Sequence, residues 1–323
     1  MPAKVAIVSA AHVHAPSFVT CLKRAGAEIV GVWDDDPVRG QDFAAKFEIP
    51  FVEDLDALLN KSEVSVICSE NLKHADHIEA CIKKDQKILC EKPIAGKLDD
   101  LNRIKNLAGG GLVATAFPCP FSPSFEAVLS KIQNGEIGKI LAVNATNQGN
   151  CPGGWFTNPD LSGGGAMIDH VVHVADLLRR IIGENPSGVH AQVGKNRFDG
   201  AGDDTAIVTV DFPGGVFASI DASWSKPTSY KTWGNVNLTI VGEKGVIELA
   251  LFVQGLDVYS DPKSRHYHVG TGSNLDQMMI DDFLRAVETG SEPKSTLADG
   301  LWASEIAIKA YQSVAAGGAL VGV

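Results

Sequence analysis

Residues 88–95 read Ile-Leu-Cys-Glu-Lys-Pro-Ile-Ala, a short apolar run that ends in two opposite charges and a proline. Such a run is typical of a buried parallel strand that stops at the carboxyl edge of an open α/β sheet, where ligands bind. Proline holds the residue before it in extended geometry. We therefore expect Lys92 to point into a cleft, where a lysine with a buried stem suits proton transfer. The alternative is a surface lysine paired with Glu91.

Strands and helices alternate around this stretch through the first 116 residues. Parallel strands need a crossover between them, usually a helix, so the alternation predicts a doubly wound parallel sheet of the α/β class. We expect this first domain to span residues 1–120. Its strands are predicted at 5–8, 28–33, 51–52, 64–68, 87–90 and 112–116, and its helices at 17–25, 37–47, 54–60, 74–84 and 98–108, with a turn at Gly109-Gly110-Gly111.

The pattern changes at Phe117-Pro118-Cys119-Pro120, where the prolines suit a domain boundary. Beyond Gly183, strand-like runs follow one another without helices between them, and such runs should pair as an antiparallel sheet. Residues 121–323 are therefore predicted to form a second, α+β domain. Its strands are expected at 139–146, 188–193, 205–212, 216–224, 236–241, 246–250 and 256–259, and its helices at 125–133, 166–182, 275–288 and 297–316.

The composition narrows the classes of partner. The chain has 323 residues, 28 basic and 39 acidic side chains, a net charge of −11 and no Lys/Arg-rich run, which argues against nucleic acid and anionic membranes. The six cysteines are scattered without a C-x-x-C pair, and the apolar run 5–8 is too short for a signal peptide or a membrane span. We expect a cytoplasmic protein with reduced thiols.

The first strand-to-helix turn departs from the usual G-x-G-x-x-G pattern, in which glycines let the backbone approach a pyrophosphate. Ser9, Ala11 and His14 stand at the glycine positions. Asp34, at the end of the second strand, is placed to accept hydrogen bonds from ribose hydroxyls, which favours NAD over NADP. The alternative is that Asp34 merely caps the next helix, a role that Asp36 could fill instead.

The same turn contains His12-x-His14, which could be half of a metal site. A barrel metallohydrolase would use such a pair, but it needs eight βα units, and the alternation stops after six predicted strands. We therefore predict no metal.

Residues 163–176, Gly-Gly-Gly-Ala-Met-Ile-Asp-His-Val-Val-His-Val-Ala-Asp, place polar groups in an otherwise apolar helix. Asp169 and His173 are four residues apart and Asp176 follows three later, so all three share one helical face. Buried polar groups are unfavourable unless partnered. A single histidine there would usually be a satisfied core residue, but this cluster indicates a functional site.

Three features together resemble the Gfo/Idh/MocA oxidoreductases along the whole chain: Glu91-Lys92-Pro93, the loop at residues 69–74 (Ser-Glu-Asn-Leu-Lys-His), and the line Gly-Gly-Gly-x-x-x-Asp-x-x-x-His. The resemblance implies a Rossmann domain that binds NAD(P). It also implies a second domain with a large open antiparallel sheet that supports the substrate side and oligomerisation, as a homodimer or homotetramer.

By this resemblance, Lys92 is the catalytic lysine, His173 the general acid/base and Asp169 its polar partner. The resemblance, with the turn and the strand ends, implies a cofactor site of Ser9, Ala11, His12, Asp34, Ser69, Asn71, His74, Glu91 and Lys92. The loop before the Asp169 helix is expected to form the substrate wall, with Trp155, Phe156 and His170. Two departures are the missing glycines and a segment 116–121 without the arginine that many members carry there, so an acidic or phosphorylated substrate loses one partner.

We therefore expect an NAD(H)-dependent dehydrogenase or reductase that acts on a secondary alcohol or ketone of a sugar, cyclitol or related polyol, with NADP as the less favoured cofactor. The nicotinamide would take the hydride while Lys92 and His173 manage the proton. The rival hypothesis is a non-catalytic regulatory protein of the same fold that binds dinucleotide or sugar. The altered turn favours this rival, and the retained Lys92, Asp169 and His173 disfavour it.

Overall fold

The computed structural model describes residues 2–107, 111–195, 197–198, 202–253, 255–260, 265–270 and 272–323. The predictions extend beyond the described residues at two points: Gly109 and Gly110 of the predicted turn, and Ala108 at the end of a predicted helix.

Five strands form the first sheet in the order β2-β1-β3-β4-β5, and each neighbouring pair runs parallel, which confirms the doubly wound sheet. The prediction of a strand at residues 51–52 is wrong, since Phe51 makes an isolated bridge to Val32. Pro50, just before it, has no N–H with which to extend the pairing. The strands are β1 (Lys4–Val8), β2 (Glu28–Trp33), β3 (Val64–Ile67), β4 (Lys87–Cys90) and β5 (Val113–Thr115).

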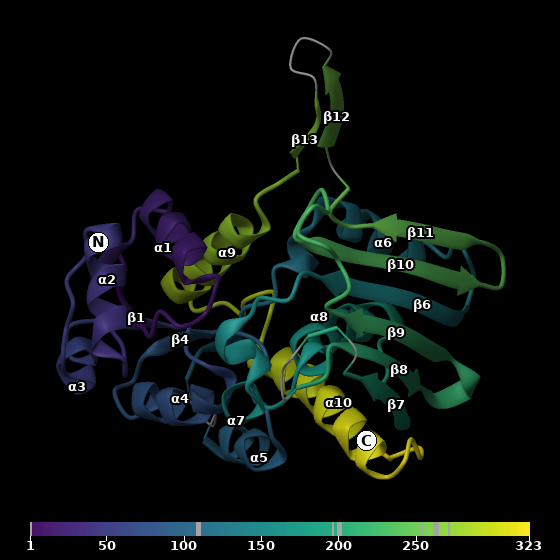
Figure 1. Cartoon of the computed structure of the whole chain (residues 1–323), viewed down its shortest axis with the longest axis horizontal. Coiled ribbons are helices and arrows are strands. Elements are labelled where there is room, and N and C mark those ends of the chain that lie inside the picture. The colour runs from purple at the N-terminus through teal and green to yellow at the C-terminus, as the bar shows by residue number, and fades with distance from the viewer. Residues whose placement is uncertain are drawn as a thin grey trace.

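Helices cover both faces of this sheet (Figure 1). Alternate residues of β1 point to opposite faces, so Val5 and Ile7 join one core while Ala6 and Val8 join the other. The first core also contains Phe283 from a late helix, α9 (Leu275–Thr289), which packs on α1. The division at residue 120 stays a prediction. The covering helices are α1 (Ala15–Arg24), α2 (Pro37–Phe47), α3 (Leu55–Leu59), α4 (His74–Ile82) and α5 (Leu98–Leu107).

The second sheet has six strands in the order β11-β10-β6-β9-β8-β7. Four of its five neighbouring pairs are antiparallel as predicted, but β6 and β9 run parallel, so the sheet is mixed. The connection from β6 to β9 includes a long helix and a strand pair, which lets the chain return in the same direction. The strands are β6 (Ile140–Gly149), β7 (Gly188–Gly194), β8 (Thr205–Asp211), β9 (Phe217–Ser223), β10 (Gly234–Gly242) and β11 (Val246–Ala250).

Two long helices pack beside the second sheet, and one of them also contacts the first sheet. α8 (Ala166–Ile182) packs on the second sheet, and α10 (Leu297–Ala315) contacts α8 and β7 on one side and α5 and β5 on the other. In Figure 1, β12 (Gly255–Ser260) and β13 (Arg265–Gly270) form a hairpin that projects from the body. The strand β13 was not predicted from the sequence. The remaining helices are α6 (Pro123–Gln133) and α7 (Pro159–Ser162), with short 3₁₀ turns at η1 (Asn71–Lys73), η2 (Cys119–Phe121), η3 (Gly154–Thr157) and η4 (Pro213–Gly215).

None of the helices in the described part of the chain combines the length and the apolar run that a membrane span requires. All six cysteines are free thiols, and five of them are buried.

Candidate active site

Lys92 and Asp169 meet where the two halves of the chain come together. Lys92 follows β4 at the carboxyl edge of the parallel sheet and is only 3% exposed. Its Nζ donates to Oδ1 of Asp169, in the first turn of α8, over 2.7 Å. Lys92 is therefore a buried lysine with a fixed carboxylate partner from the other half, and the surface alternative is wrong.

Asp169 is held on its other oxygen as well. Its Oδ2 accepts a hydrogen bond from Nε1 of Trp224 at 3.1 Å and lies 3.3 Å from Nε2 of His170. Burial alone would raise the pKa of Asp169, but the charge of Lys92 and the neighbouring His170 hold it well below its usual range. The carboxylate therefore stays ionised and neutralises Lys92.

His173 lies one turn further along α8 and is 8% exposed. The predicted partnership between Asp169 and His173 is not a direct bond, because the Asp169 oxygens face Lys92, Trp224 and His170. Nδ1 of His173 is buried without a hydrogen-bond partner in the described structure, which leaves Nε2 as its accessible nitrogen. Burial and the charge of Lys92 hold the pKa of His173 well below 6.5, so the ring is neutral.

Asp176, the third polar group of the predicted face, belongs to a different cluster. Its Oδ1 accepts from Nε of Arg180 at 3.1 Å, one turn along α8, and Asp299 of α10 lies beyond that arginine. It does not line the cavity described below. Its role is the joining of α8 and α10.

A cavity of about 510 Å³ connects these groups. Lys92, Asp169 and His173 line one part of it, and Val13 and His14 at the start of α1 line another. The rest of the lining is mostly apolar or carries hydroxyl and amide groups, and includes Pro118, Cys119, Ser122, Asn147, Pro152, Phe156, Thr232, Trp233, Val236, Leu251, Phe252, Ser273, Asn274 and Asp276. A cavity with mixed apolar and polar walls of this kind suits a small polar ligand.

The three glycines before α8 are required by close packing. A Cβ on Gly165 would lie 1.9 Å from the carbonyl oxygen of Asp203, and one on Gly164 would lie 2.1 Å from the hydroxyl of Tyr311. Gly163 has φ +81°, in the left-handed region that favours glycine. The Asp203 side chain also accepts from the backbone N–H of Met167 at 2.7 Å. The glycines thus let the start of α8, and with it Asp169, sit directly against Asp203.

The first turn contains no glycine, but its backbone includes a conformation that glycine usually adopts. Ser9 has φ +68°, and its hydroxyl donates to Oδ2 of Asp34 at 3.2 Å. The Ala11 N–H bonds the Ser9 hydroxyl, and its carbonyl accepts from Nε1 of Trp155 at 3.0 Å. Val13 lines the cavity, and its N–H makes no hydrogen bond within the described residues. The turn therefore leaves one backbone donor for a phosphate-bearing cofactor.

Asp34 is more heavily engaged than its sequence position suggests. Both of its oxygens accept from Arg39, at 2.9 Å from Nε and 2.7 Å from Nη2, and Oδ2 also accepts from the Ala10 N–H at 2.7 Å. Arg39 continues to Glu70 across a 3.1 Å ion pair. The capping alternative is wrong, because Asp36 caps α2. A ribose at Asp34 must therefore compete with Arg39.

The predicted cofactor loop is mostly bonded to protein. His74 contacts the carbonyl oxygens of Pro93 and Ser69 at 2.8 and 3.1 Å, and the Ser69 hydroxyl contacts His77. Asn71 donates to the carbonyl of Ser162 at 2.8 Å, while its own Oδ1 is buried without a partner in the described structure. His74 and Ser69 thus hold the Lys92–Pro93 segment in place, and Asn71 retains a free acceptor.

The predicted substrate residues differ in position. Phe156 lines the cavity and stacks on Trp155 with ring centroids 3.9 Å apart. Trp155 and His170 are not part of the lining, and Nδ1 of His170 lies 2.8 Å from the carbonyl oxygen of Asn147. Both therefore support the wall from behind.

Two residues that sequence reasoning missed complete the site, and a third has a partner that it missed. Trp224, directly after β9, holds Asp169, and Arg39 holds Asp34. His14, considered above only as half of a metal pair, contacts Oε1 of Glu91 at 2.9 Å. Arg39 stands five residues after Asp34 in the first turn of the next helix, a spacing that brings it back over the strand end. Trp224 gives no comparable local signal.

Two family models match this chain. One, described as the oxidoreductase family with an NAD-binding Rossmann fold, matches residues 4–110. The other, described as the GFO/IDH/MocA C-terminal domain, matches residues 125–248. Together they cover more than half of the chain.

Curated relatives and solved structures agree with this match. The chain is 26% identical to inositol 2-dehydrogenase of Rhizobium meliloti over 305 residues, 90% of each protein. It is 26% identical to myo-inositol 2-dehydrogenase of Thermotoga maritima, over 77% of this chain and 76% of that one. The crystal structure of GenD2 from gentamicin A biosynthesis, in complex with NAD, has the same fold, with a TM-score of 0.87 at 20% identity over 100% of this chain and 96% of that one. The chain belongs to the GFO/IDH/MocA family of oxidoreductases with an NAD-binding Rossmann fold.

Proposed function

We propose that this protein is an NAD(H)-dependent oxidoreductase that transfers a hydride between nicotinamide and a secondary alcohol or ketone of a sugar, cyclitol or related polyol. One observation carries the proposal: a buried Lys92–Asp169 pair and a neutral His173 line the same cavity. A cation and a proton acceptor at one cavity wall are what alcohol oxidation requires of the protein. The relatives named inositol 2-dehydrogenase support the substrate class.

The residues divide the work as follows. When bound, the nicotinamide accepts or donates the hydride. Nε2 of the neutral His173 takes the hydroxyl proton of the alcohol. Lys92 donates a hydrogen bond to the same oxygen and stabilises the negative charge that develops there. Asp169 positions Lys92, and Trp224 positions Asp169.

The lining supports an uncharged substrate that is rich in hydroxyl groups. Ser122, Asn147, Thr232 and Asn274 offer hydroxyl and amide groups to the cavity. Among the described lining residues, Lys92 is the only Lys or Arg, and Asp169 already neutralises it. No lysine or arginine of the described lining is therefore free to pair with an acidic or phosphorylated substrate.

Asp34 supports NAD as the preferred cofactor, with NADP less favoured. A carboxylate at the end of β2 accepts ribose hydroxyls and repels a 2′-phosphate. Ser9, Ala11, His12, Ser69, Asn71, His74 and Glu91 complete the proposed cofactor region, with Val13 as the free backbone donor. Assembly as a homodimer or homotetramer and a cytoplasmic location stay predictions, and light scattering of the purified protein tests the assembly.

Dinucleotide binding tests the proposal first, and substrate turnover tests it second. Calorimetry with millimolar NAD, NADH, NADP and NADPH should show association, strongest for NAD or NADH. A screen of sugars, inositols and sugar acids, followed by the absorbance of the reduced cofactor, should then give turnover. No association with any of the four dinucleotides would contradict the proposal.

The rival is a non-catalytic dinucleotide- or sugar-binding regulatory protein of the same fold. It is favoured by the first turn, where the N–H groups of Ala10, Ala11, His12 and His14 are already bonded to protein acceptors. The rival predicts binding without turnover for every compound in the same screen.

A further inference from the structure

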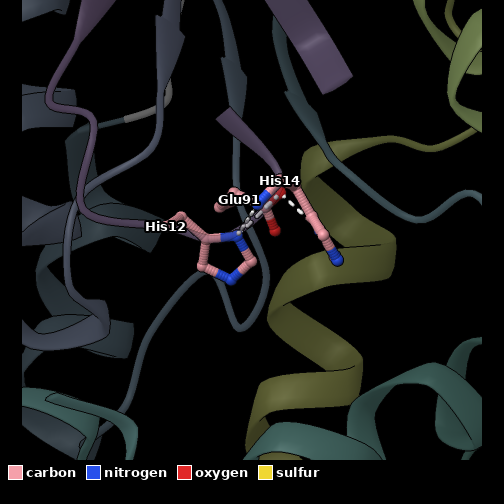
Figure 2. A group of neighbouring side chains, drawn as sticks. All are labelled: His12, His14 and Glu91. Atoms are coloured by element: carbon pink, nitrogen blue, oxygen red, sulfur yellow. Dashed lines mark hydrogen bonds and ion pairs between the residues drawn. The ribbon is translucent and has the colours of Figure 1, made fainter. Parts of the chain in front are cut away.

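We infer that His12, His14 and Glu91 form a binding site for a divalent transition-metal ion at the wall of the cavity. His12 and His14 lie in the turn after β1, and Glu91 follows β4, so the carboxyl edge of the sheet brings them together. The three side chains converge in Figure 2. The sequence offered half of this site as His12-x-His14, and the fold supplies the missing carboxylate.

The spacing of the donor atoms matches a metal site. Oε1 of Glu91 lies 2.9 Å from Nδ1 of His14 and 3.3 Å from Nδ1 of His12, and the three donor atoms lie within 4.8 Å of one another. Tetrahedral zinc with bonds of about 2.0–2.1 Å places neighbouring ligand atoms about 3.3 Å apart. One ion can therefore reach all three atoms after small side-chain movements.

Nδ1 of His12 and Oε1 of Glu91 lie close together without a hydrogen bond between them. Nδ1 of His12 has one lone pair, which accepts the backbone N–H of His14 at 3.2 Å. The same nitrogen lies 3.3 Å from Oε1 of Glu91, an ion-pair distance without the geometry of a hydrogen bond. A metal ion at this point would take the lone pair of His12 in place of the His14 N–H and would bind the Glu91 oxygen as well.

Glu91 also differs from the other buried carboxylates near the sheet edge. Asp34 is paired with Arg39 and Asp169 with Lys92. Glu91 is 0% exposed, and its described partners are two imidazole rings and the backbone N–H of Lys92. A buried carboxylate is unfavourable without a counter-charge, and a divalent ion supplies one.

The cavity gives the site access and an open position. His12 and His14 both line it, and the side chain of His14 is 36% exposed. Two imidazoles and one carboxylate with a free fourth position are the ligand set of zinc in several catalytic sites. Magnesium and calcium prefer oxygen ligands, so we assign the site to zinc or a similar first-row ion.

Cobalt and zinc titrations of the chelator-treated full-length protein test this site without any enzyme assay. We expect about one ion per chain by calorimetry, the visible absorption of tetrahedral Co²⁺, and a zinc-dependent rise in the thermal midpoint because the ion binds the folded state. Residues that only hydrogen-bond to metal ligands contribute about 10–100-fold to metal affinity. A ligand itself contributes more, so His14→Ala or Glu91→Gln should weaken binding at least about 100-fold.

His190→Gln is the matched control, because His190 lies on β7 of the second sheet and outside the cluster. This variant should bind cobalt and zinc as the parent does. His14 is the partly exposed member, so its replacement is the variant expected to disturb the fold least. No zinc heat and no cobalt band in the parent, or equal affinity in the parent, His14→Ala and Glu91→Gln, would overturn the assignment.

Discussion

Nζ of Lys92 and Oδ1 of Asp169 lie 2.7 Å apart although Lys92 follows a strand of the first sheet and Asp169 lies in α8, which packs on the second sheet. Both side chains are nearly buried, at 4% and 5% exposure. In such surroundings each charge depends on the other, since a lone buried charge is far more unfavourable than a buried pair. The pair therefore fixes the position of the two halves relative to each other as well as the charge of the cavity.

The first prediction concerns the stability of this pair. Asp169→Asn leaves Lys92 charged and unpaired, and breaking a buried pair typically lowers the free energy of unfolding by about 3–5 kcal/mol. Lys92→Met should lower it similarly, because Asp169 is then uncompensated. The double variant Lys92→Met/Asp169→Asn should lose less unfolding free energy than the sum of the two single losses. Urea unfolding of the four proteins measures this coupling, and strictly additive losses would contradict it.

The second prediction concerns His173. Removing a positioned acid/base usually costs about 10²- to 10⁴-fold in rate, so His173→Ala should lower kcat by that range while the dinucleotide affinity stays nearly unchanged. Steady-state kinetics with the best substrate of the screen and calorimetry with the cofactor measure the two quantities. A kcat close to that of the parent would move proton transfer to Lys92 or another group.

The third prediction is a pH dependence. Alcohol oxidation needs unprotonated His173, whose pKa is held well below 6.5, so the rate should stay level as pH falls to 6.5 and decline only below that value. Lys92→Met removes a charge that lowers this pKa, so the acid limb should move to higher pH. Asp169→Asn removes a charge that raises it, so the limb should move to lower pH. Identical profiles in parent and variants would remove the assignment.

The fourth prediction concerns cofactor choice. Asp34→Ser with Asp35→Arg removes the ribose acceptor, releases Arg39 and adds a second arginine, so the preference should shift toward NADP. The ratio of kcat/KM for NAD and NADP measures this shift. Asp36→Ser is the control, because Asp36 caps α2 and serine also caps helices. An unchanged ratio in the double variant would mean that Asp34 does not face the ribose.

The fifth prediction concerns the glycines before α8. Gly165→Ala places a Cβ 1.9 Å from a backbone oxygen of Asp203, which cannot move without shifting the loop. Overpacking of this kind costs about 1–3 kcal/mol and sometimes more, so we expect a loss of about 3 kcal/mol in unfolding free energy. Gly111→Ala is the matched control, since nothing lies within 4 Å of its Cβ. Thermal unfolding of the two variants should separate them clearly, and equal midpoints would contradict the packing argument.

The sequence predicted the elements of the fold better than their pairing. Short continuous apolar runs that alternate with helices identified the parallel sheet, because its strands are buried on both faces. The parallel pairing of β6 with β9 was not predictable, since it depends on a long connection and not on either strand. Likewise, the two-residue run at Phe51 looks like a strand until the neighbouring proline is considered.

The same limit applies to the candidate site. Helical spacing placed Asp169 and His173 on one face of α8, and the family resemblance implied that Asp169 is the polar partner of His173. Asp169 instead bonds Lys92 and Trp224, which come from distant parts of the sequence. Arg39 at Asp34 and Glu91 at His12 and His14 are contacts of the same kind. Local spacing fixes which face a side chain occupies, whereas its partner is decided by tertiary packing.

We propose that Lys92, Asp169 and His173 perform alcohol oxidation with a nicotinamide cofactor. The most direct measurement follows reduced-cofactor absorbance for the parent and His173→Ala with NAD and a panel of inositols and sugars. We predict turnover with at least one polyol in the parent and a loss of about 10²- to 10⁴-fold in the variant. Cofactor binding without turnover of any polyol in the parent would contradict the claim.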